Sequence, residues 1–203
     1  MSQPTVAQYL EFANLQIAAE AFYGLKNTSP NWQENNGNLQ FSNLLDGTTG
    51  TAHLVTGNEH ASKFPADLAE KFTGNWEVVA HIGNTGTGFS GTLFKAKNDI
   101  EGTEIKEGDV TLSFRSTEFI EDAVRDNRAT NKFEIKDKGF AFSQMSDMVQ
   151  WVQLLQEKGL FPADKSTYVT GYSLGGHLAT AFNLLQQSGM FEQNGHKAVE
   201  VSV

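Results

Sequence analysis

Residues 168–181 read YVTGYSLGGHLATA. The first residues favour a β-strand, and the residues from Leu174 onward favour a helix. Between them, residues 171–175 match the pattern G-x-S-x-G, with Ser173 at its centre. A strand, a tight turn that carries a serine, and a helix together form a nucleophile elbow. The stretch therefore predicts a reactive serine at the end of a strand in an α/β protein.

The glycines of the turn have a physical reason. A side chain at 171 or 175 would collide with the neighbouring strand and helix. The turn also directs the first amides of the helix towards the oxygen on which negative charge develops during attack on a carbonyl. We expect the Leu174 N–H to be such a donor. The alternative is a glycine-rich turn with an idle serine, and the flanking strand and helix favour the elbow.

Elements upstream and downstream of the turn extend this fold prediction. The second half alternates helix and strand, which predicts βαβ units in a mostly parallel sheet with flanking helices. Thr5 begins a capping box before a helix that ends near Gly24, and the pattern becomes strand-like from about Thr51. The remaining expected elements are strands at 76–82, 89–95, 109–114, 167–170 and 198–203 and helices at 140–158 and 174–187.

Composition limits the function classes. The 203 residues, 39% of them apolar, are enough for a single domain over residues 1–203. With 15 basic and 24 acidic residues the net charge is −9, which argues against nucleic-acid binding. There is no cysteine, so disulfides and thiolate sites are excluded. No apolar run reaches the roughly 18 residues of a membrane span. No Sec-type signal opens the chain, so we expect secretion by a non-Sec route or a cytoplasmic location.

Residues 86–91 read GTGFSG, a literal G-x-G-x-x-G after a strand. A dinucleotide-binding fingerprint must open a helix. The residues that follow alternate as a strand does, so we interpret this segment as a hairpin or bulge. The scattered histidines show no metal-ligand spacing, and we expect no cofactor.

A second segment adds a family resemblance. Residues 112–117 read LSFRST, and together with GYSLGGHLA at 171–179 they resemble the class 3 lipases, which have the α/β-hydrolase fold. The likeness is greatest to bacterial extracellular phospholipase A1 and lipase. It covers residues 76–190 and implies that Ser173 is the nucleophile, that Thr117 is the second oxyanion donor, and that Arg115 anchors the strand end.

The sequence departs from the family pattern at two positions: Ser116 replaces a glycine and Tyr172 replaces a histidine. Asp122 matches an acidic residue that is usually structural in that family. The family's lid corresponds to residues 118–139, where apolar residues are embedded in alternating charge. That segment is either an amphipathic lid that opens at a lipid surface or a solvated helix with charge pairs.

A serine nucleophile of this fold acts with an acid and a histidine as a catalytic triad, and these two residues are missing from the expected positions. The fold requires the chain order serine, acid, histidine. After Ser173 the only carboxylates are Glu192 and Glu200, and the only histidines are His177 and His196. His177 lies one helical turn past the serine, so we expect it to be structural. We therefore expect that the C-terminal part of the domain is absent, and that further sequence or a second chain supplies the acid and the histidine.

These observations predict a serine ester hydrolase of lipid esters, most simply a phospholipase A1 or triacylglycerol lipase, that is weakly active or inactive in this form. Its partners would be a phospholipid or acylglycerol substrate and, transiently, a lipid surface. The resemblance leaves calcium open, but no calcium-binding repeat is present. The alternatives are a lipase-like scaffold that binds lipid or a protein without catalysis, and a non-lipid esterase or acyltransferase.

Overall fold

The computed structural model describes residues 4–22, 49–57, 62–83, 85–116, 141–192 and 201–202. Its strands form one sheet in the order β1-β2-β3-β4-β5. They are β1 (Trp76–Ile82), β2 (Gly91–Ala96), β3 (Val110–Phe114), β4 (Thr167–Gly171) and β5 (Val201–Ser202). The helices are α1 (Val6–Ala21), α2 (Thr49–Thr56), α3 (Ala66–Asn75), α6 (Phe142–Glu157) and α7 (Leu174–Gln187). The prediction of an α/β protein with helices beside a sheet is confirmed.

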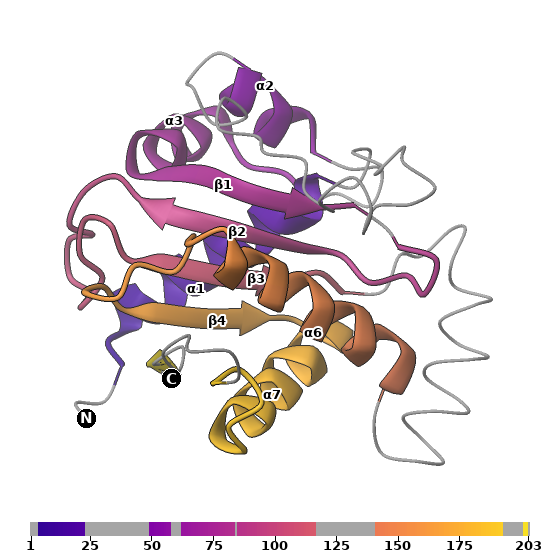
Figure 1. Ribbon diagram of the computed structural model, residues 1–203. Coiled ribbons are helices and arrows are strands. Elements are labelled where there is room, and N and C mark those ends of the chain that lie inside the picture. Colours follow the sequence, from indigo (N-terminus) through magenta and orange to yellow (C-terminus); the bar gives the residue numbers. More distant parts are fainter. Residues whose placement is uncertain are drawn as a thin grey trace.

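The strand directions correct one part of that prediction. β1 pairs with β2 and β2 with β3 in antiparallel fashion, whereas β3–β4 and β4–β5 are parallel. The sheet is therefore mixed, and the expected mostly parallel sheet is wrong for this part of the chain. Short connections join the first three strands, and a parallel pair needs a longer crossover. The predicted helix–strand alternation does hold after β3, where α6 leads to β4 and α7 follows it (Figure 1).

The segment 86–91 forms the connection into β2, which begins at Gly91 and runs antiparallel to β1. The interpretation as a hairpin is confirmed, because no helix follows these glycines. The predicted N-terminal helix is confirmed, and the Thr5 hydroxyl accepts the Gln8 N–H at 3.1 Å and caps α1. The capping box is incomplete, because the Gln8 side-chain oxygen has no hydrogen-bond partner among the described residues.

The strand-like interpretation from about Thr51 is wrong, because residues 49–56 form α2. Threonine and valine give this segment β-propensity, but Leu54 is fully buried and its packing against the core outweighs that propensity. Helix α3, which the sequence analysis did not anticipate, places Phe72 in the same core cluster.

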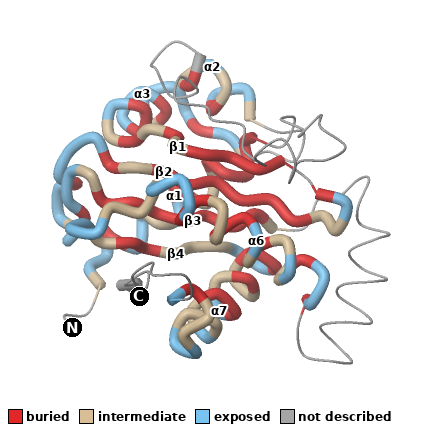
Figure 2. Tube along the Cα trace, in the orientation of Figure 1, coloured by how far each residue is buried: buried red, intermediate tan, exposed pale blue. Residues whose placement is uncertain are grey.

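Buried side chains form two core clusters, one on each face of the sheet. Residues of α1, α2 and α3 pack with Trp76 and Phe94, and residues of α6 and α7 pack with Leu93 and Leu112. Figure 1 shows α6 and α7 in front of the sheet and α1 behind it, and Figure 2 shows β1 to β3 buried along most of their length. No helix in the described ranges is long and apolar enough to cross a membrane.

Candidate active site

Ser173 occupies the turn between β4 and α7, as the G-x-S-x-G pattern predicts. Its backbone has φ 53° and ψ −117°, and it is the single non-glycine residue with positive φ in the part of the chain that the structure describes. A side chain in this region of φ and ψ is strained, and such strain is concentrated at functional sites. The side chain is exposed. The local geometry is that of a nucleophile elbow.

The two flanking glycines are needed for close backbone packing. A Cβ on Gly171 would overlap the backbone carbonyl of Gly175 in the first turn of α7. A Cβ on Gly175 would overlap the carbonyl of Phe114 at the end of β3. The predicted collision with helix and strand is therefore confirmed. Because glycine has no side chain at these two positions, α7 can begin directly beside the end of β3.

Leu174 is the first residue of α7 and is 5% exposed. Its N–H lies in the first turn, where amides have no acceptor within the helix. It is therefore placed as a donor for an anion near Ser173. Thr117, the second donor expected from the sequence, lies outside the described residues, as do Asp122 and the segment 118–139.

The end of β3 approaches the elbow from one side. Phe114 is the register partner of Gly171 in β4, so both strands end at the same level. Beyond that pair, the Arg115 N–H donates to the Ser90 carbonyl at 3.1 Å and the Ser116 N–H donates to the Glu20 carboxylate at 2.7 Å. Arg115 is 3% exposed, and its role as an anchor of the strand end stays a prediction.

His177 is turned towards the start of α6. Its Nε2 accepts the backbone N–H of Ala141 at 3.3 Å, and its backbone N–H makes the helical hydrogen bond to the Ser173 carbonyl at 3.1 Å. Burial lowers the pKa of His177 below its ordinary value of 6.5, so the neutral ring that can accept this hydrogen bond is favoured. These contacts support the structural role that we predict for His177.

The Ser173 hydroxyl makes no hydrogen bond to a histidine or a carboxylate among the residues that the structure describes. His53 in α2 packs against Phe22, and His81 in β1 is buried beside Thr92. Glu192 is exposed after α7, and Glu200 and His196 lie outside the described residues. The described ranges also contain no group of three or more histidine or acidic side chains that could hold a metal ion.

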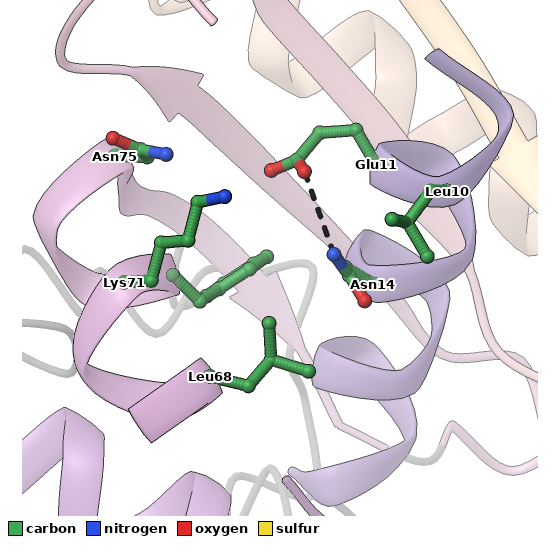
Figure 3. Close-up of a pocket in the computed structure, with 7 residues that line it drawn as sticks. Leu10, Glu11, Asn14, Leu68, Lys71 and Asn75 are labelled. Atoms are coloured by element: carbon green, nitrogen blue, oxygen red, sulfur yellow. Dashed lines mark hydrogen bonds between the residues drawn. The ribbon is translucent and has the colours of Figure 1, made fainter. Parts of the chain in front are cut away.

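A small cavity of about 60 Å³ lies between α1 and α3, lined by Leu10, Glu11, Asn14, Leu68, Lys71, Phe72 and Asn75 (Figure 3). Asn75 directly precedes β1, so the cavity lies towards the amino-terminal end of β1. Ser173 follows the carboxyl end of β4, and β1 and β4 run in the same direction. The cavity and Ser173 therefore lie at opposite ends of the strands.

Glu20, which holds the Ser116 N–H after β3, is a residue near the candidate site that the sequence pattern did not indicate. It lies in the last turn of α1, 96 positions before its partner Ser116. One signal was present in the sequence: an acidic residue among alanines at the C-terminal end of a helix opposes the helix dipole.

Comparisons with known proteins give no relative: no family model matches the sequence, and no curated protein or solved structure matches it.

Proposed function

We propose that this protein is a serine ester hydrolase of the α/β-hydrolase type that acts on lipid esters, with Ser173 as its nucleophile. The observation that carries the proposal is the backbone of Ser173, which holds a non-glycine residue at φ 53° between a strand and a helix. A serine with no special role would not require a strained backbone at an exposed turn.

Ser173 Oγ would attack the ester carbonyl carbon, and the negative charge would pass to the carbonyl oxygen. The Leu174 N–H would stabilise that oxyanion, with Thr117 as the second donor that the resemblance to class 3 lipases implies. Collapse of the tetrahedral intermediate would release the alcohol and leave an acyl group on Ser173, which water would hydrolyse. The reaction needs a general base that takes the Ser173 hydroxyl proton during the attack and returns it to the leaving alcohol oxygen, because a serine hydroxyl is a poor nucleophile at neutral pH.

Exposed aromatic side chains near the elbow favour a lipid ester over a polar one. Tyr172, which directly precedes Ser173, is 67% exposed. Phe142 at the start of α6 is 53% exposed, and it follows Ala141, which is hydrogen-bonded to His177. Apolar surface of this kind suits acyl chains and contact with a lipid surface. The resemblance to class 3 lipases suggests a phospholipase A1 or a triacylglycerol lipase.

The test is labelling of the full-length protein with a fluorophosphonate, which reacts covalently with activated serines. We expect labelling of the wild type and none of Ser173→Ala. Ser188→Ala is the matched control, because Ser188 caps the other end of α7 and its hydroxyl donates to the Leu185 carbonyl. Labelling that persists in Ser173→Ala would overturn the proposal, and a folded wild type that is not labelled would favour the non-catalytic scaffold.

Substrate class is tested separately. Fatty-acid release from phosphatidylcholine vesicles and from triacylglycerol emulsions would be compared with hydrolysis of a short soluble ester. Faster turnover of the lipid substrates is expected. A strong preference for the soluble ester would instead indicate a non-lipid esterase.

A further inference from the structure

Glu20 is a buried carboxylate that joins α1 to the chain leaving β3. It is 8% exposed, and its Oε1 accepts the Ser116 N–H at 2.7 Å and the Gln16 side-chain amide at 3.1 Å. Helix α1 lies on the face of the sheet opposite α6 and α7 (Figure 1). A residue from the far face therefore reaches the backbone next to the nucleophile turn.

This carboxylate is placed against the usual preferences for a charge. Burial removes it from water, which costs free energy unless hydrogen bonds replace the lost hydration. The C-terminal end of a helix also carries partial negative charge, which is unfavourable for an acidic side chain. Helix stability alone therefore does not explain Glu20, and its hydrogen bonds with Ser116 and Gln16 offset part of the cost of its burial.

Ser116 lies where the sheet no longer fixes the chain. The β3–β4 ladder ends at the pair Phe114 and Gly171. Beyond it, Ser116 is held by Glu20 instead of by a neighbouring strand. The carbonyls of Phe114 and Arg115 meanwhile lie against Gly175, one residue after the Leu174 N–H. The hydrogen bond from Ser116 therefore helps set the spacing between the chain leaving β3 and the first amides of α7.

We propose that Glu20 is a positioning residue for the oxyanion hole, an inference that rests on the proposed hydrolase function. Glu20 holds the Ser116 backbone, and thereby the end of β3, whose Phe114 and Arg115 carbonyls pack against Gly175 beside the Leu174 N–H. A displacement of about 1 Å at such a donor can cost about a hundredfold in rate. Residues 4–22, which carry no catalytic motif, thereby become part of the working site.

The test compares Glu20→Met, which keeps the side-chain length but cannot accept a hydrogen bond, with Glu20→Gln, which keeps an acceptor oxygen. Glu11→Ala is the matched control, because Glu11 is the α1 carboxylate that accepts the Trp76 indole N–H at 2.6 Å, away from β3's carboxyl end. The readouts are kcat and KM on a soluble ester, the unfolding free energy, and hydrogen exchange of the Ser116 amide by NMR.

We expect Glu20→Met to lower kcat about tenfold to a hundredfold with KM nearly unchanged. Glu20→Met should also lose some stability, because the Ser116 N–H and the Gln16 amide lose this acceptor, so kcat is compared under conditions in which both proteins are folded. The Ser116 amide should exchange faster, and Glu20→Gln should restore both protection and rate. Glu11→Ala should lower the unfolding free energy but leave kcat and the exchange of the Ser116 amide unchanged.

A normal kcat in Glu20→Met, or equal losses in Glu20→Met and Glu20→Gln, would overturn the positioning role. The hydrogen-exchange measurement separates failure of the positioning role of Glu20 from failure of the proposed hydrolase function. An inactive wild type would overturn the role in catalysis, while the protection of Ser116 would still show whether Glu20 holds this backbone.

Discussion

Gly175 in the first turn of α7 packs directly against the carbonyl of Phe114, the last residue of β3. The contact joins two backbones, so neither side can yield by a change of rotamer. It brings the start of α7, with the Leu174 N–H, to the same point as the end of β3. The candidate site therefore depends on the absence of one methyl group.

Gly175→Ala should destabilise the protein. The new Cβ would overlap the Phe114 carbonyl oxygen, and overpacking of this kind costs about 1–3 kcal/mol. The unfolding free energy in urea measures the loss. Gly74→Ala in α3 is the control, because nothing lies within 4 Å of its Cβ position. It should gain up to about 1 kcal/mol from helix propensity, and similar changes in the two variants would contradict the packing argument.

Ser173→Gly should raise stability while it removes reactivity. Glycine adopts φ 53° without the steric cost that a Cβ imposes. The relief of strain, about 1–3 kcal/mol, exceeds the extra unfolded-state entropy of glycine, about 0.4–1 kcal/mol. Thermal and urea unfolding would be compared with Ser173→Ala, which keeps the Cβ and should resemble the wild type in stability. If the two variants are equally stable, the turn is not strained.

The elements that the sequence predicts well are those fixed by local pattern. The strand at 76–82 has the bounds of β1, and the helix at 174–187 has those of α7. The elbow was also predictable, since its glycines and its strand–helix context are adjacent in the chain. Helix α2 was not predictable from local pattern, because the burial of Leu54 in the tertiary core outweighs the local β-propensity.

Contacts between distant segments account for the rest. The hairpin of β1 and β2 was predicted, but the antiparallel pairing of β2 with β3 was not, because the βαβ rhythm of the second half was extended to the rest of the sheet. The contact of Glu20 with Ser116 spans 96 positions, and no periodicity in either segment predicts it. Local sequence therefore predicts the nucleophile turn but not what holds the neighbouring strand end.

Asp109 should be important for the start of the parallel pair β3–β4. It is 3% exposed, and its two carboxylate oxygens accept the N–H groups of Lys106 and Ser166. Asp109→Ala leaves both donors without this acceptor and should cost about 2–4 kcal/mol. Asp109→Asn, which keeps one acceptor oxygen, should cost less.

Urea unfolding measures both changes. Asp99→Ala is the control for Asp109, because Asp99 also accepts a backbone N–H, from Glu107, but is exposed to solvent. We expect a clearly smaller change there. A loss as large as that of Asp109→Ala would show that burial does not decide the effect.

Stability should fall as the pH is lowered through the range in which histidine titrates. Burial lowers the pKa of His177 below 6.5, and burial also lowers the pKa of His53. Below pH 6.5 the unfolded chain then binds more protons than the folded chain, so acid favours unfolding. The stabilising contribution is fully present above pH 6.5 and is lost as the pH falls through the folded-state pKa.

His177→Gln isolates one of the two contributions. A protonated Nε2 cannot accept the Ala141 N–H, whereas the glutamine side-chain oxygen can accept it at any pH. The unfolding free energy, measured between pH 8 and about pH 5.5, above the range in which most carboxylates titrate, should therefore decline less steeply in His177→Gln than in the wild type. A slope identical to that of the wild type would mean that His177 is not held neutral in the folded state. In that case its contact with Ala141 would not link the elbow helix to the start of α6.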